Sequence, residues 1–170
     1  MRATDATRPQ TTLQGQATVF IAVDRGTAEC VGIHAAKVGS RFEALEPIRQ
    51  GIKARFGASY GQGVALGLAI RHDNGSQYTS DVFQNELRFL GAQSSPSFVR
   101  SPEGNGCAER FIRPLKEQLL WVRTFSTVEE LRQALLDWAH RYSEHWLLER
   151  HNFLSPSQAR RELMQSRQAA

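Results

Sequence analysis

Three carboxylates occupy positions from which they could act together. Asp73 directly follows a short apolar segment, residues 67–72; Glu109 stands early in a predicted helix, and Asp5 precedes a predicted hairpin. A carboxylate at the end of a strand projects from the sheet edge where open α/β sheets bind ligands. Carboxylate oxygens are the ligands that Mg²⁺ prefers, and two such ions about 3.5–4 Å apart can clamp the attacking and leaving oxygens at a phosphodiester. The trio therefore suits metal-dependent phosphodiester chemistry.

Ordinary surface charge is the alternative interpretation for each of these residues. The chain has 17 Asp and Glu residues, and most of them must be solvated side chains. A choice among them needs further information, beginning with the elements that would position them.

Hydrophobic periodicity predicts strands that alternate with helices. The predicted strands are 1–6, 17–24, 29–35, 67–72 and 92–95. The predicted helices are 40–56, 80–90, a segment from Gly106 to about Val122, a long helix from 126 to about 146, and a short last helix from Ser155-Pro156. This order favours a mixed sheet with helices on both faces.

Several residues predict where these helices begin or end. Ser80 and Gly91 predict the two caps of helix 80–90, and Ser126 with Glu129 forms a capping-box pattern before the long helix. Pro47 inside helix 40–56 predicts a kink or a late start.

Two segments around the carboxylates resemble a known signature. Residues 71–80, RHDNGSQYTS, resemble the "D-[HN]-G-S-[EQ]-[FY]-T-S" pattern of bacterial insertion-sequence transposases with a retroviral-integrase-like core. Residues 101–111, SPEGNGCAERF, resemble their "S-P-x-x-N-[AG]-x-x-E-[RS]-F" pattern, and 35 residues separate Asp73 from Glu109, as in that family. The OrfB-type proteins of insertion-sequence family three are the most similar group.

The resemblance implies a fold, an activity and a cofactor. The fold would be α/β and ribonuclease-H-like, a mixed five-stranded sheet flanked by helices. Residues 1–124 would form an N-terminally clipped integrase catalytic core, and residues 125–170 a helical extension packed on it. The activity would be that of a DDE-type polynucleotidyl transferase that cleaves and transfers DNA strands, with two Mg²⁺ or Mn²⁺ ions held by Asp5, Asp73 and Glu109.

The first of the three carboxylates has two candidates. The segment Thr4-Asp5-Ala6-Thr7 resembles the family's "T-D-x-T" segment on the first strand. Asp24 ends the next predicted strand, where the family often has an Asp outside the metal site. Asp5 is therefore favoured over Asp24.

Basic and turn-forming residues near the motifs are candidates for DNA contacts. Lys116, two helical turns beyond Glu109 and on the same face, matches a basic residue of the family. Arg110 and Arg113 could also contact phosphate, although the sequence predicts that both are offset from Glu109, and solvation explains them equally well. Asn74 and Gly75 are expected to shape the turn at Asp73. Asn105 and Gly106 would similarly position the start of the Glu109 helix.

Composition sets the broader expectations. With 170 residues, 41% of them hydrophobic, and a formal net charge of +4, the chain is typical of a globular protein, compatible with a polyanionic partner. The sequence shows no membrane span and no secretory signal, and Cys30 and Cys107 fit no metal-ligand spacing. We expect reduced thiols, a cytoplasmic, nucleoid-associated protein, DNA partners (transposon ends and target) and a homo-oligomer on DNA.

Two departures from the family pattern raise an alternative. The sequence starts at Met1, without the family's upstream tryptophan and N-terminal DNA-binding region, which predicts poor pairing of a clipped first strand. Pro114 falls inside the Glu109 helix, where a proline costs about 3 kcal/mol. The alternative is an inactive relic that binds only DNA or a full-length transposase. Another nuclease on the same fold, such as a ribonuclease H or a junction resolvase, fits the Asp73 motif less well.

Overall fold

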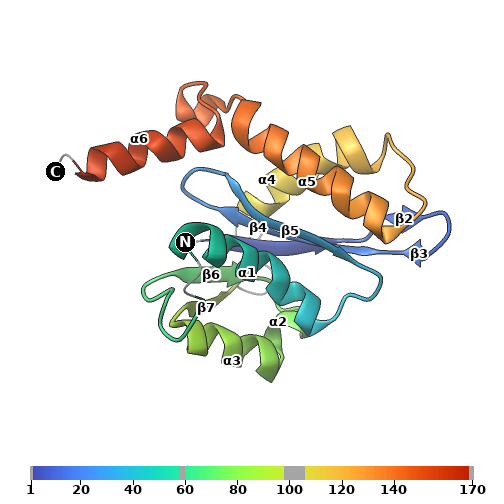
Figure 1. The fold of residues 1–170 in the computed structure, drawn as a ribbon, viewed down its shortest axis with the longest axis horizontal. Helices are drawn as coiled ribbons and strands as arrows, with labels where there is room; N and C mark the ends of the chain where they lie inside the picture. Colours follow the sequence, from blue (N-terminus) through green and yellow to red (C-terminus); the bar gives the residue numbers. More distant parts are fainter. Residues whose placement is uncertain (1, 58–59, 98–105, 169–170) are drawn as a thin grey trace.

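A five-stranded mixed sheet forms the centre of the molecule (Figure 1). The computed structural model describes residues 2–57, 60–97 and 106–168. The strands lie in the order β5-β4-β1-β6-β7. Their bounds are β1 Arg2–Thr7, β4 Thr18–Asp24, β5 Cys30–Ala36, β6 Ala69–His72 and β7 Gln93–Pro96. The pairs β5–β4 and β4–β1 are antiparallel, and β1–β6 and β6–β7 are parallel. The mixed five-stranded sheet predicted from the sequence is confirmed.

The first strand pairs along its whole length, so the prediction of poor pairing is wrong. Every residue of β1 has a partner on β4, from Arg2 opposite Asp24 to Thr7 opposite Val19. Ala3 is buried, and the hydroxyl of Thr4 donates to the carbonyl of Ile21 at 2.7 Å. The central place of β1, between β4 and β6, supplies the partners that its own low apolar content did not indicate.

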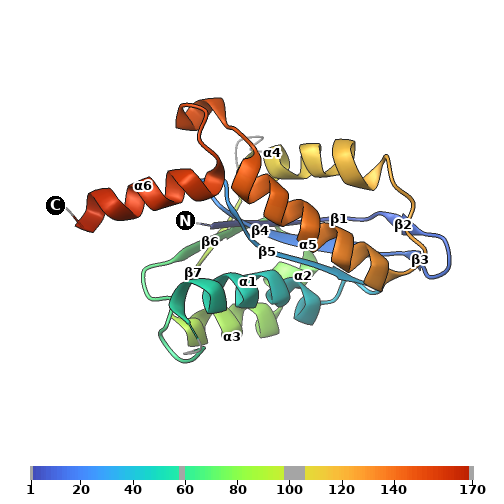
Figure 2. The ribbon, with the colours of Figure 1, turned by 45° about the horizontal axis from the view of Figure 1, so that its top comes forward.

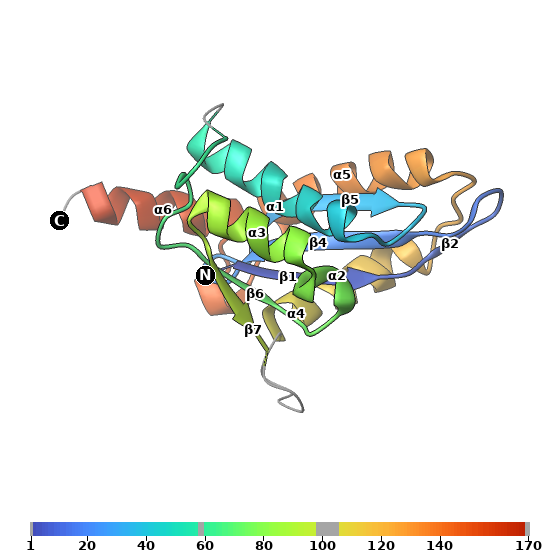
Figure 3. The ribbon, with the colours of Figure 1, turned by 90° about the horizontal axis from the view of Figure 1, so that it is seen from below.

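Helices cover both faces of the sheet (Figure 2). Successive side chains of a strand point to opposite faces. Val19 and Ile21 of β4 therefore join a core with α4 (Gly106–Leu115) and α5 (Val128–His145). Phe20 joins a second core with α1 (Arg41–Phe56) and α3 (Asp81–Leu90). Figure 3 shows β6 and the edge strand β7 beside α3 and the short helix α2 (Ser76–Thr79).

The helix α1 runs in one piece through Pro47. It begins directly after Ser40, whose hydroxyl accepts from the backbone N–H of Glu43 at 3.3 Å, so no late start occurs. Pro47 is buried against β5, and a Cβ added at Gly32 would lie 2.0 Å from the carbonyl oxygen of Pro47. Glycine at position 32 thus allows the close approach of the helix to the sheet.

The long C-terminal helix α5 is capped one residue later than predicted. Thr127, not Ser126, is the N-cap, and its hydroxyl accepts from the N–H of Glu130 at 3.1 Å. The Glu130 carboxylate accepts from the N–H of Ser126 at 2.7 Å, whereas Glu129 pairs with Arg132. Both Ser-x-x-Glu and Thr-x-x-Glu occur here, and the sequence pattern alone does not choose between them.

The C-terminal helix α6 (Pro156–Gln168) follows α5 after a short 3₁₀ turn, η2 (Glu149–His151). The hydroxyl of Ser155 accepts from the N–H of Gln158 at 3.3 Å, as the predicted N-cap requires. The sequence did not predict the small hairpin of β2 (Gln10–Thr11) and β3 (Gly15–Gln16). Within the described helices, none is both long and apolar enough to cross a membrane.

The helix that carries Glu109 changes type after Pro114. α4 ends at Leu115 and continues as a π-helix, η1 (Lys116–Leu120). Its last hydrogen bond runs from the N–H of Trp121 to the carbonyl of Lys116 at 2.9 Å, an i→i+5 bond. Segments of π-helix are rare and frequently lie at functional sites. The proline therefore does not end the helix, and the turn after it is wider.

Candidate active site

A cleft of about 420 Å³ lies between β1 and the α4–η1 helix. Asp5 lines it from the central strand and Glu109 from the first turns of α4. The residues that line it are Asp5, Ala6, Glu109, Ile112, Arg113, Lys116, Glu117 and Trp121. The cleft thus joins two predicted carboxylates and the predicted lysine.

Asp5 is partly buried, and its carboxyl group is difficult to ionise. Its Oδ1 accepts from the N–H of Ala6 at 2.8 Å. Burial, and to a smaller extent the charges of Asp73 and Glu109, raise the pKa of Asp5 to about 6, against the lowering effects of the Ala6 hydrogen bond and of Lys116. Desolvation and like charges both disfavour an ionised carboxylate. The two other predicted carboxylates therefore lie near enough to act on Asp5.

Asp73 stands at the carboxyl end of β6, which runs parallel to β1 at its side. Its Oδ1 accepts from the N–H of Gly75 at 2.8 Å, and a Cβ added at Gly75 would lie 2.9 Å from that oxygen. The side-chain amide of Asn74 donates to the carbonyl of Ser97 at 3.0 Å. Asn74 and Gly75 thus shape the turn at Asp73, although none of the three lines the cleft.

His72 is held beneath this turn as a buried structural residue. Its Nε2 lies 2.8 Å from the Ser94 hydroxyl and its Nδ1 lies 2.6 Å from the carbonyl of Asp73. Its ring stacks on that of Tyr78, with centroids 5.7 Å apart. Both ring nitrogens are engaged, so His72 is not available as a ligand.

The chemistry of the donors fits a hard divalent cation, because three carboxylates offer only oxygen ligands. The three carboxylates are, however, farther apart than the ligands of a single metal ion. Within the described residues, no three His, Cys, Asp or Glu side chains are gathered closely enough to hold one ion.

The predicted basic residues separate into two groups. Arg113 and Lys116 line the cleft with Glu109, so the predicted offset of Arg113 is wrong: four residues along a helix return to the same face. Arg113 Nε is 2.9 Å from the Glu117 carboxylate. Arg110 instead lines a separate pocket of about 90 Å³ with the free thiol Cys107, Tyr142 and Arg150, among others.

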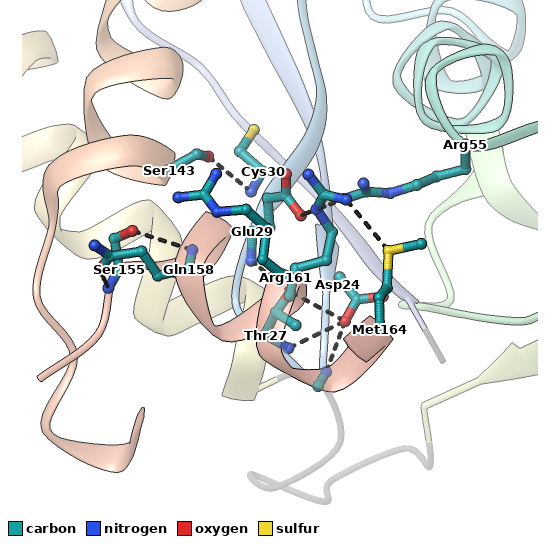
Figure 4. Close-up of polar contacts among 12 residues, drawn as sticks. Asp24, Thr27, Glu29, Cys30, Arg55, Ser143, Ser155, Gln158, Arg161 and Met164 are labelled. Carbon is teal, nitrogen blue, oxygen red and sulfur yellow. Dashed lines mark hydrogen bonds and ion pairs between the residues drawn. The ribbon is translucent and has the colours of Figure 1, made fainter. Parts of the chain in front are cut away.

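Asp24 lies outside the cleft, at the end of β4 and next to a turn (Figure 4). Its Oδ1 accepts from the backbone N–H groups of Gly26 at 2.9 Å and Thr27 at 3.1 Å. It faces a different pocket of about 490 Å³, near the ion pair of Glu29 with Arg55. Asp24 is therefore engaged in local structure, three register positions from Asp5 along β1 and β4.

Sequence reasoning missed part of the cleft and named residues that the structure does not describe. Ser101 to Asn105 of the second motif lie outside the described residues; Gly106 begins α4. Glu117 and Trp121, which line the cleft, were not singled out. Glu117 is four residues beyond Arg113 on the same helix, a spacing that the sequence shows, whereas Trp121 follows the change to a π-helix and α-helical periodicity gives no signal for it.

Comparisons of the sequence with known proteins point to transposases. Residues 90–146 match the family model of the integrase core domain. The transposase of insertion sequence IS904 from Lactococcus lactis subsp. lactis (strain IL1403) is 40% identical over 76 residues, which cover 45% of this chain and 30% of that protein. A putative transposase, InsD of insertion element IS2E from Escherichia coli (strain K12), is 40% identical over 48 residues, 28% of this chain and 22% of that protein. The chain thus matches less than a third of the length of these relatives.

Comparisons of the structure give integrase catalytic cores. The BIV integrase catalytic core domain has a TM-score of 0.68 at 17% identity and covers 98% of this chain and 96% of its own. A chain of the simian T-cell lymphotropic virus intasome in complex with PP2A regulatory subunit B56 gamma has a TM-score of 0.73 at 18% identity, covering 93% and 52%. The HTLV-2 integrase core in complex with magnesium has a TM-score of 0.65 at 16% identity, covering 93% of both chains. The fold is that of an integrase catalytic core, and the sequence relatives are transposases.

Proposed function

We propose that this chain is the catalytic core of a bacterial insertion-sequence transposase, a DDE-type polynucleotidyl transferase that cleaves DNA strands and joins them to a target. The observation that carries the proposal is the cleft shared by Asp5, Glu109 and Lys116, with Asp73 close enough to raise the pKa of Asp5. Residues 1–124 would be the core. Residues 125–170 would be a helical extension, of which α5 packs against β5 and shares the core of α4.

The metal-binding role falls to three residues. Asp5, Asp73 and Glu109 would hold two Mg²⁺ or Mn²⁺ ions, which when bound would activate the nucleophile and stabilise the leaving oxygen. The HTLV-2 integrase core, a structural neighbour, was solved with magnesium. Gly75 and Asn74 would keep the Asp73 carboxylate in place, since one bonds to it and the other ties its turn to Ser97.

The basic residues would position DNA through its phosphates, contacts that carry no sequence information. Lys116 and Arg113 stand in the cleft and would contact phosphates next to the scissile bond. Arg110, in the neighbouring pocket with Arg150, would contact the DNA farther from it. The partners would be transposon ends and target DNA in the bacterial cytoplasm, on a homo-oligomer, as the intasome among the structural neighbours is a multi-component assembly.

Cleavage of supercoiled plasmid DNA in Mg²⁺ or Mn²⁺ tests the proposal. Asp73→Asn and Glu109→Gln should each lower cleavage by more than about a hundredfold, because losing even an outer residue of a metal site costs about 10- to 100-fold. Both variants should bind DNA nearly as the parent chain does, since neither change removes a phosphate contact. Asp137→Asn, an exposed carboxylate on α5, is the matched control and should cleave normally.

Two outcomes would overturn this function. Cleavage that survives Asp73→Asn or Glu109→Gln would place the chemistry elsewhere. A parent chain that binds the plasmid without cutting it in either metal would support the inactive DNA-binding relic instead.

A further inference from the structure

Trp121 is a large apolar side chain in an exposed position at the candidate active site. It is 70% exposed, and it lines the same cleft as Asp5, Glu109 and Lys116. The tryptophan on α5, Trp138, is by contrast 4% exposed and stacks on Tyr142 with ring centroids 5.3 Å apart. An indole normally contributes by burying its large apolar area. At Trp121 the fold leaves that area open toward the cleft.

The π-helix determines where this indole stands. In an α-helix, five residues make about 1.4 turns, and Trp121 would point to a different face from Lys116. Here the N–H of Trp121 bonds to the carbonyl of Lys116 at 2.9 Å, so the turn is wider and the angle between the two side chains is smaller than in an α-helix. Trp121 and Lys116 accordingly line the same cleft. The wide turn after Pro114 thus places an aromatic ring in a cleft that two cations and three carboxylates also line.

We propose that Trp121 forms a base-stacking subsite, in which the indole face binds an unpaired nucleobase beside the phosphodiester held in the cleft. This inference rests on the proposed function, and it names which feature of the DNA the site recognises. Every base has a π-face, and aromatic side chains bind single-stranded nucleic acid by stacking on it. A base within a duplex has both faces covered by its neighbours, so the subsite selects a frayed, flipped or single-stranded base.

The cleft supplies the remaining contacts that such a nucleotide needs. Lys116 and Arg113 offer cationic groups to the phosphates on either side of the base, and Arg113 shares its charge with Glu117. Ile112 contributes an apolar wall. The neighbouring Val122 is also 70% exposed but does not line the cleft, so it provides a matched control for simple loss of apolar surface.

The test compares three DNA probes on the full chain: a 15-nucleotide single strand of mixed sequence, its blunt duplex, and the same strand with abasic sites. Trp121→Ala should weaken binding of the single strand by about 5- to 150-fold, the loss expected for one stacked base. The same change should leave binding of the abasic strand nearly unaltered and affect the blunt duplex less than the single strand. Trp121→Phe should restore most of the affinity, and Val122→Ala should not alter it.

The outcomes separate the subsite from the proposed function. Equal losses on the abasic and base-containing strands, or equal losses in Val122→Ala, would overturn stacking. So would a Trp121→Ala variant that binds all probes normally but changes its oligomeric state in sedimentation, which would indicate a protein contact. Failure of the proposed function would appear differently, as a parent chain that does not cleave plasmid DNA in Mg²⁺ or Mn²⁺, a result that does not depend on the Trp121 variants.

Discussion

Asp5 on the central strand and Glu109 on the helix α4 line one cleft, and the charge of Glu109 is among the causes that raise the pKa of Asp5 to about 6. The two residues are far apart in the chain, and the packing of α4 on β1 and β4 brings them together. Because the charge of Glu109 acts on the Asp5 carboxyl group, substitutions of Asp5 should change both the stability of the chain and its response to metal ions.

The stability of the metal-free chain should depend on the protonation of Asp5. Burial is the first cause that raises its pKa from 3.8 to about 6. Because the folded state binds the proton more tightly, the contribution of Asp5 is fully present below about pH 4 and is lost as the pH rises through 6. Urea unfolding in EDTA should therefore show Asp5→Asn, which cannot ionise, gaining about 1–3 kcal/mol over the parent between pH 4 and 7. Parallel pH curves for the two proteins would contradict this.

A bound divalent metal ion should offset the loss of stability that follows ionisation of Asp5. A cation that binds only the folded state stabilises it by about 2.7 kcal/mol at a hundred times its Kd, which corresponds to a rise in Tm of about 5–10 °C for a chain of this size. Thermal unfolding with Mg²⁺, with Mn²⁺ and after EDTA measures the effect. Glu109→Gln should lose most of the rise, and the exposed Asp137→Asn should keep it. A Tm indifferent to both metals in the parent chain would argue against the site.

Glycine at position 75 should matter more for activity than for stability. A Cβ there would lie 2.9 Å from Asp73 Oδ1 and 2.6 Å from Gln77 Nε2, so both side chains must move. Gly75→Ala should lower cleavage by about 10- to 100-fold and the free energy of unfolding by only about 1 kcal/mol. Gly61→Ala is the control, because no atom lies within 4 Å of its added Cβ. Normal cleavage by Gly75→Ala would show that the Asp73 turn tolerates displacement.

Lys116 should contribute a phosphate contact that salt weakens. Each neutralised phosphate releases counterions, so Lys116→Ala should lower the slope of log affinity against log salt concentration by about 1. Its affinity should fall about equally for unrelated duplex sequences. Lys37→Ala removes an exposed lysine away from the cleft and should leave the slope unchanged. A loss confined to one DNA sequence would instead assign Lys116 to base recognition.

The sequence predicted most of the elements because their signals are local. Apolar runs marked β4 and β5, and Ser40, Ser80 and Gly91 marked helix ends where the structure has them. The capping of α5 was misplaced by one residue because two overlapping patterns compete there. Pairing of β1 depends on neighbours far along the chain, which its own composition does not reveal.

The sequence predicted those residues of the candidate site that belong to a family motif. It did not predict the residue that follows the change from α-helix to π-helix. The charges of the motif residues Asp73 and Glu109 both act on Asp5, although Asp73 does not line the cleft. Trp121 could not be placed from the sequence, because its position depends on an i→i+5 bond after Pro114 and not on α-helical periodicity. Asp5 lies within a strand and Asp24 at the end of one, and only the fold shows that Asp5 faces the cleft and that Asp24 bonds to the turn beside it.

The choice between Asp5 and Asp24 gives the most discriminating prediction. Asp24→Asn keeps an oxygen that can accept from Gly26 and Thr27, so cleavage and stability should stay near parental values. Asp24→Ala leaves those N–H groups without this acceptor and should cost about 1–2 kcal/mol of stability, with cleavage retained at temperatures where the variant is folded. Asp5→Asn should show the opposite pattern, since it removes a proposed metal ligand and also removes the cost of a buried charge beside Asp73 and Glu109. Its cleavage should be lost while its metal-free stability at neutral pH rises.

Plasmid cleavage and urea unfolding on the same three preparations measure both properties. Loss of cleavage in Asp24→Asn with activity retained in Asp5→Asn would move the first carboxylate of the site from β1 to the end of β4.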